Sequence, residues 1–102
     1  MVLLARRRTQ NIRLSIITAG ELSVLFDNAL AAWEFLQDWQ IYRLYPGVMD
    51  AAADIDRELM SRGQRLGVND NWIAGLAFYY GEPLVSRDAA FDRVPGIRRV
   101  AY

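Results

Sequence analysis

Cysteine, histidine and lysine are all missing from this sequence. Without cysteine there is no disulfide framework, no thiolate zinc site and no cysteine nucleophile. Without histidine there is no Ser-His-Asp triad and no imidazole ligand for zinc. Without lysine there is no P-loop lysine, Schiff base or lysine general base. Carboxylates, hydroxyls and guanidinium groups remain, and they suit a carboxylate-metal hydrolase or a two-carboxylate glycosidase, although no motif supports the glycosidase.

Long hydrophobic runs are also missing. The apolar stretch at residues 2–5 is short, and arginines follow it at residues 6–8, the reverse of a signal peptide. We therefore expect a cytoplasmic protein with no membrane segment. The 102 residues, 53% of them hydrophobic, predict one domain over residues 1–102. Twelve basic and twelve acidic residues cancel, which argues against binding nucleic acid by bulk charge.

Short hydrophobic strands alternate with helices along the chain. Thr18 is a predicted N-cap, Gly63 a predicted helix stop, and Asn69 and Gly81 the predicted ends of another helix. We expect strands at 14–17, 41–45, 83–86 and 98–101, and helices at 19–28, 31–39, 48–62 and 70–80. This alternation predicts an α/β fold with a mainly parallel sheet.

Three carboxylates follow predicted strands or open predicted helices: Glu21, Asp70 and Asp88. In an open parallel sheet, the carboxyl ends of strands and the following helix starts lie along one edge, where such folds bind ligands. Carboxylates gathered there repel one another, and a hard divalent cation such as Mg²⁺ neutralises them. The sequence therefore predicts a metal site formed by these residues.

Each carboxylate also has a purely structural explanation. Thr18 and Glu21 have the spacing of a capping box, in which Glu21 only accepts a hydrogen bond from a backbone N–H. Asp70 in a first helical turn is favoured by the helix dipole alone. Asp88 is equally compatible with a solvated position or an ion pair with Arg87. Spacing alone does not choose between these explanations and the metal site.

Three segments carry motifs in a specific order. They are residues 15–22 (SIITAGEL), 69–75 (NDNWIAG) and 81–88 (GEPLVSRD), the last continuing to 91–96 (FDRVPG). They resemble the second strand with its helix start, the aspartate-bearing helix start and the C-terminal signature of PIN domains, the nuclease fold of VapC-type toxins. The resemblance covers nearly the whole chain. It implies a PIN-like, three-layer α/β/α fold with a short, mainly parallel sheet.

The resemblance also implies a chemistry. In PIN domains, acidic residues hold Mg²⁺ or Mn²⁺, and a metal-activated water cleaves RNA. By motif, Glu21, Asp70 and Asp88 match three of the four acidic residues of the family. The family often has another acidic residue just before the phenylalanine of its last motif, where this chain has Ala90, so Asp92 is the alternate ligand.

The sequence departs from the family at its start. The family opens with a central strand ending in the first metal-binding aspartate, but here no acidic residue precedes Glu21. A parallel crossover needs about a dozen residues, more than lie between residues 5 and 12. We therefore expect residues 1–8 to be the tail of an early helix, and the domain to be N-terminally truncated, without its opening strand. Weak metal binding, impaired activity and a homodimer that covers the open sheet would follow.

These observations predict a VapC-type endoribonuclease that uses Mg²⁺ or Mn²⁺ and has RNA as its substrate. The alternative is a catalytically silent PIN-like module that binds a partner protein. In VapC-like proteins, the region of Phe26, Trp33, Phe35 and Trp39 contributes to the dimer or to the surface that binds the antitoxin. If these aromatic side chains are exposed rather than in the core, they mark an interface.

Overall fold

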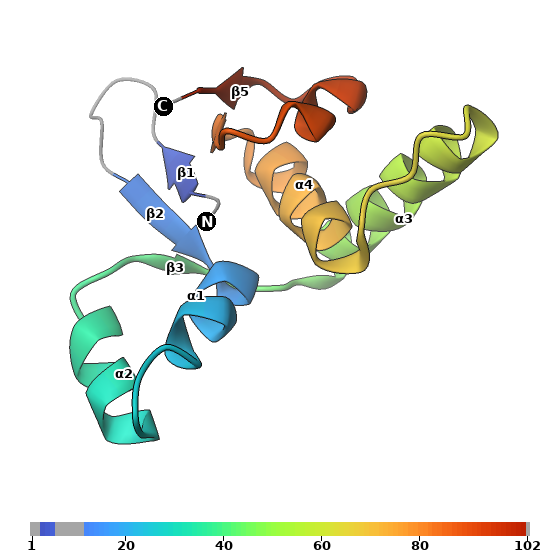
Figure 1. Cartoon of the computed structure of the whole chain (residues 1–102). Coiled ribbons are helices and arrows are strands. Elements are labelled where there is room, and N and C mark those ends of the chain that lie inside the picture. Colours follow the sequence, from blue (N-terminus) through green and yellow to red (C-terminus); the bar gives the residue numbers. More distant parts are fainter. Residues whose placement is uncertain (1–2, 6–11, 102) are drawn as a thin grey trace.

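The computed structural model describes residues 3–5 and 12–101 of the chain (Figure 1). In chain order the elements are β1 (Leu3–Ala5), β2 (Ile12–Ser15), α1 (Ile16–Ser23), α2 (Ala29–Leu36), β3 (Ile41–Tyr42), α3 (Pro46–Ser61), α4 (Val68–Tyr80), β4 (Leu84–Val85), the 3-10 helix η1 (Ala89–Arg93) and β5 (Arg99–Val100). Within the described ranges, no helix is long and apolar enough to cross a membrane.

The five strands form one sheet in the order β3-β2-β1-β4-β5. The outer pairs, β2 with β3 and β4 with β5, are parallel. Only β1, at the centre, runs antiparallel to both of its neighbours. Four strands therefore point the same way, which confirms the predicted α/β fold with a mainly parallel sheet.

The expectation that the chain has no opening strand is wrong. Leu3–Ala5 is a strand at the centre of the sheet, not the tail of a helix, while residues 1–2 and 6–8 lie outside the described residues. The link from Ala5 to Ile12 is too short for a parallel crossover, but an antiparallel connection needs far fewer residues. Because β1 fills the centre, an open sheet no longer argues for a homodimer.

Helices cover both faces of the sheet. Leu84 of β4 and position 13 of β2 both pair with position 4 of β1, so these positions share one face. Leu84 belongs to the core that α3 and α4 form. Leu14, the next residue of β2, faces the opposite side, where it packs with Ala19 and Leu36 of α1 and α2. This arrangement gives the predicted three layers.

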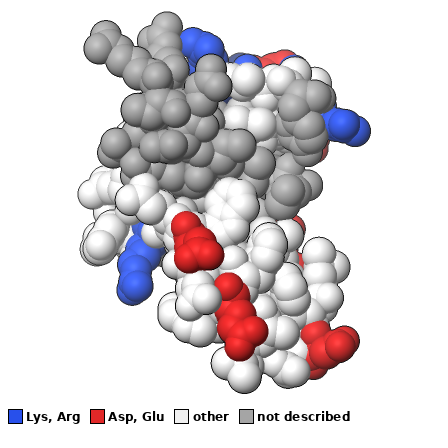
Figure 2. Space-filling view, turned by 90° about the vertical axis from the view of Figure 1, so that its left-hand side faces the viewer, with Lys and Arg blue, Asp and Glu red and all other residues white. Residues whose placement is uncertain are grey.

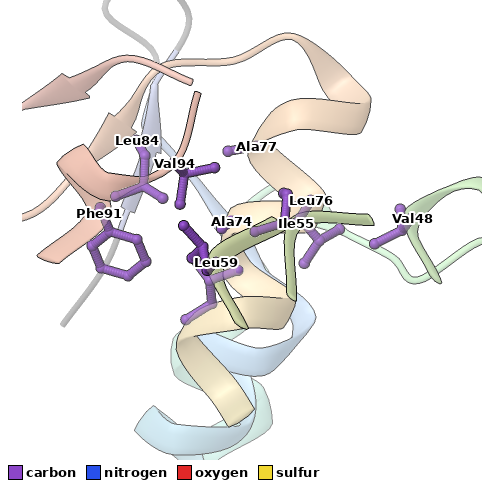
Figure 3. Close-up of a cluster of buried hydrophobic side chains, with 10 residues drawn as sticks. Val48, Ile55, Leu59, Ala74, Leu76, Ala77, Leu84, Phe91 and Val94 are labelled. Atoms are coloured by element: carbon purple, nitrogen blue, oxygen red, sulfur yellow. The ribbon is translucent and has the colours of Figure 1, made fainter. Parts of the chain in front are cut away.

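The larger core lies between α3, α4 and β4 (Figure 3). Val48, Ile55 and Leu59 of α3 recur at helical spacing and are buried, as the apolar periodicity of residues 48–62 predicts. On α4, Gly75 lies so close to α3 that an added Cβ would be 2.8 Å from the Cβ of Ala52. The two helices therefore approach each other more closely than a larger side chain would permit.

Two helix starts differ from expectation. The first helix begins at Ile16 rather than Ala19, because the hydroxyl of Ser15, not of Thr18, accepts the capping hydrogen bond, 3.0 Å from the backbone nitrogen of Thr18. The last long helix begins at Val68 with Gly67 at its N-cap, and no side chain caps it. The predicted stop at Gly81 is confirmed by its left-handed backbone, with φ of 66°.

The close approach at Gly75 generates a prediction for stability. Gly75→Ala should lower the free energy of unfolding by about 1–3 kcal/mol, because the new methyl group forces α3 and α4 apart. Gly20→Ala in α1 is the matched control, since nothing lies within 4 Å of its added Cβ. It should be neutral or stabilising by up to about 1 kcal/mol. Urea denaturation measures both, and equal effects would contradict the close packing.

Candidate functional site

Polar side chains gather where β2 and β4 end. These parallel-directed strands finish at the same sheet edge, at Ser15 and just before Ser86. Ser15, Thr18 and Ser86 are the buried polar residues of the described chain. Ser15 and Thr18 hydrogen-bond each other at 3.1 Å between their hydroxyl oxygens. Of these three hydroxyls, that of Ser86 contacts a predicted site residue, Asp88. The sequence suggests a capping role for Thr18 and none for the two serines.

Asp70 occupies the first turn of α4 and is partly buried. Burial raises the pKa of its carboxyl group, and the negative charge of Asp88 raises it further. The interaction joins residues from two elements that are 18 positions apart in the sequence. The structure therefore places Asp70 and Asp88 in the same region.

Asp88 is held by the backbone around it. Its own N–H donates to the hydroxyl oxygen of Ser86 at 3.0 Å. Its carboxylate Oδ1 accepts from the backbone N–H of Ala90 at 2.9 Å and so caps η1. Asp88 is exposed.

Glu21 does not form the capping box that is the structural alternative for this residue. The helix starts five residues before it, so Glu21 lies beyond the first turn of α1 and its side chain is exposed. Glu21 and Asn69 line the same shallow hollow between α1 and the start of α4. Glu21 thus faces the element that carries Asp70.

Asp92, the alternate ligand, is engaged elsewhere. Both of its carboxylate oxygens accept from the guanidinium of Arg99, each at 2.9 Å. This hydrogen bonding lowers the pKa of Asp92. Arg99 also donates to the backbone carbonyl of Ser86 at 3.0 Å, so it ties β5 and η1 to the end of β4. The sequence does not predict the role of Arg99, because no local pattern indicates which acidic residue an arginine will pair with.

The residues present fit a divalent cation only in part. Within residues 3–5 and 12–101, no three acidic side chains converge closely enough to form a ready metal site. However, Mg²⁺ usually keeps several of its waters and is held in proteins by one or two carboxylates. Repulsion between Asp70 and Asp88 is relieved by a cation between them. The donor set thus suits a hard, partly hydrated cation.

The sequence and the fold were compared with known proteins. The family model described as PIN domain matches residues 3–97. Among curated proteins, no sequence matches the chain. Solved structures with the same fold include VapBC2 from Rickettsia felis bound to a DNA fragment from its promoter, with a TM-score of 0.76 and 21% identity over 88% of this chain and 74% of that one.

Two further structures have the same fold. DNA-bound VapBC from Salmonella typhimurium has a TM-score of 0.73 and 27% identity over 85% of this chain and 72% of that one. VapBC-5 from Mycobacterium tuberculosis, a member of the VapBC family of toxin-antitoxin systems, has a TM-score of 0.70 and 23% identity over 87% and 79% of the two chains. The PIN-like fold that the motifs implied is confirmed.

The raised pKa of Asp70 generates a prediction for stability against pH. A carboxyl group whose pKa is raised by folding stabilises the fold below its unfolded pKa, and this contribution is lost as the pH rises through the folded value. Asp70→Asn should therefore increase the free energy of unfolding at pH 7 relative to the parent chain. This gain should shrink as the pH falls below the ordinary range of an aspartate.

Asp92→Asn is the control with the opposite sign. In the parent chain, the hydrogen bonds from Arg99 lower the pKa of Asp92. The ionised carboxylate of Asp92 therefore stabilises the fold above its unfolded pKa, and this stabilisation is lost as the pH falls through the folded pKa. This variant should be less stable than the parent at pH 7. Urea denaturation between pH 3 and pH 7 distinguishes the two variants. An Asp70→Asn protein less stable than the parent at pH 7 would contradict the repulsion from Asp88.

Proposed function

Because the chain belongs to the PIN domain family, we propose that it is a metal-dependent endoribonuclease of the VapC toxin type. The observation that carries the proposal is the placement of Asp70 in the first turn of α4 and of Asp88 after β4, where burial and then the charge of Asp88 raise the pKa of Asp70. Repulsion between like charges has an energetic cost and is frequent at sites that bind a cation.

Asp70 and Asp88 are the proposed direct ligands of Mg²⁺ or Mn²⁺, and Glu21 the residue that holds one of the ion's waters across the hollow. A bound ion supplies an activated water and offsets the charge that develops on the scissile phosphate. The chain's own residues orient this arrangement: the N–H of Ala90 and the hydroxyl of Ser86 hold Asp88 in place. No side-chain nucleophile is required.

Metal binding by the 102 residues is proposed to be weak and the activity impaired. The central strand contributes only Leu3, Leu4 and Ala5, and its reversed direction places Ala5 at the edge away from Asp88. No carboxylate of β1 therefore adds to the pair. An under-coordinated ion does not position water and phosphate together, and that positioning supplies much of the rate.

Metal binding tests this proposal with a matched pair of variants. The parent chain should bind Mn²⁺ weakly, Asp70→Asn should abolish binding, and Asp92→Asn should leave it unchanged because Asp92 is paired with Arg99. Calorimetry with Mn²⁺ measures the affinities. Cleavage of a labelled RNA at millimolar Mn²⁺ should be slow or absent in the parent.

Two outcomes would overturn parts of the proposal. Equal Mn²⁺ affinity of the parent and Asp70→Asn would remove the metal site and favour the alternative, a catalytically silent module that binds a partner protein. Fast Mn²⁺-dependent cleavage by the parent would show that the activity is not impaired.

We also propose that the chain binds an antitoxin-type protein, because the solved structures of the same fold are toxin-antitoxin complexes. The α1–α2 face, formed by these helices and the loop between them, supports a protein partner. Its exposed apolar residues are Ile16, Val24, Leu25, Leu30, Trp33 and Phe35. Trp33 is 65% exposed, so the aromatic side chains here are not all in the core.

The α1–α2 face has more acidic than basic residues. From Leu14 to Tyr42 the chain has four acidic residues and no arginine, and Arg43, the next residue, lines a hollow together with Trp33. Figure 2 shows several acidic side chains among uncharged ones over the lower half of the molecule, where α2 lies, with a basic side chain at its left edge. A partner with basic and apolar side chains is complementary to such a face. A second copy of this chain is the other proposed occupant, which gives the homodimer.

Self-association through this face is testable. Trp33→Ala should weaken the dimer by about tenfold or more, because a large exposed aromatic residue is the kind of side chain that carries binding energy. Met60→Ala on α3 is the control, since Met60 is also about half exposed, at 49%, but lies on another helix. Sedimentation at micromolar concentrations measures the association. A parent chain that stays monomeric at high micromolar concentration would rule out the homodimer.

A further inference from the structure

The first turn of α4 carries Asp70 but has no side-chain cap. Gly67 occupies the N-cap position and offers no hydroxyl or carboxylate to the free backbone N–H groups. A glycine N-cap is less stabilising than a capping side chain by about a few tenths of a kcal/mol, and it leaves the first backbone N–H groups without a side-chain partner. The carboxylate of Asp70 therefore depends on some other contact for a fixed position.

Asn71 makes such a contact. Its side-chain nitrogen Nδ2 donates to the backbone carbonyl of Ala52, in the middle of α3, at 2.9 Å. Gly75, one turn further along α4, packs against the same residue, with only 2.8 Å between its would-be Cβ and the Cβ of Ala52. Residues four apart share one face of a helix, so the close approach at Gly75 is what lets Asn71 reach the carbonyl.

The side chain of Asn71 also destabilises the fold. The side-chain oxygen Oδ1 of Asn71 is buried and has no hydrogen-bond partner among the described residues. Unpaired buried polar atoms are rare in folded proteins and destabilise them. A leucine of similar size would avoid the cost at a position that faces α3. Residues that break such a local rule tend to serve a functional site.

We propose that Asn71 is a positioning residue for the acidic pair. By fastening the uncapped first turn of α4 to α3, it fixes the direction of the neighbouring Asp70, whose position lies about 100° further around the helix. The inference rests on the proposed function for its consequence in metal binding, whereas the fastening of the helix start stands without it.

The test compares Asn71→Leu with Tyr80→Phe. The hydroxyl of Tyr80 donates to the backbone carbonyl of Arg43 at 2.9 Å, so it makes the same kind of contact at the other end of the same helix. Three quantities are measured in the full chain: amide hydrogen exchange in the first turn of α4, the dissociation constant of Mn²⁺, and Tm.

Asn71→Leu should speed amide exchange in the first turn and weaken Mn²⁺ binding by about tenfold, the effect typical of removing a residue that orients a ligand. Its Tm should be unchanged or higher, because the unpaired oxygen is gone. Tyr80→Phe should change neither the exchange in the first turn nor Mn²⁺ binding.

Unchanged exchange and unchanged Mn²⁺ affinity in Asn71→Leu would overturn the inference. If that variant misfolds, Asn71→Ala removes the same hydrogen bond without adding bulk, and the same comparison applies. If the parent chain binds no Mn²⁺, the proposed function fails, and amide exchange alone then decides whether Asn71 fastens the helix.

Discussion

The contact between α3 and α4 at Ala52 and Gly75 is the constraint on which the site depends. Because Gly75 has no side chain, α4 packs directly against the backbone of α3, and the larger core closes around this crossing. The position of α4 then determines where its first turn points. Asp70 reaches the sheet edge near Asp88 only because the rest of its helix is held by apolar packing.

The reversed central strand is a second constraint, and it follows from chain length. With six residues between β1 and β2, only an antiparallel connection is available. The antiparallel strand still pairs with both β2 and β4, so the sheet is continuous. The reversal changes the edge of the sheet at which the last residue of β1 lies. The sheet forms in spite of the reversed strand. A metal site that needs a carboxylate at the end of this strand does not form, because that end lies at the other edge of the sheet.

Much of the fold could be predicted from local patterns. Apolar spacing marks α3, and Gly81 marks the end of α4, because both signals act within a few residues. The start of α1 could not be predicted reliably, since Ser15 and Thr18 are both competent caps and tertiary packing chooses between them. The place of β1 depended on strand pairing across the sheet, which no local pattern encodes. At the site, the motifs drew attention to Asp70 and Asp88, whereas no local pattern indicated that Arg99 holds Asp92.

The two halves of the molecule differ in their cores and in the roles that we propose for them. The half built from α3, α4 and β4 has the larger core, and it carries Asp70 and Asp88. The half built from α1 and α2 has a small buried cluster and leaves large apolar side chains in solvent. Glu21 belongs to the second half, yet it shares a hollow with Asn69, the neighbour of Asp70. A partner seated on α1 would therefore lie against a hollow that the start of α4 also lines.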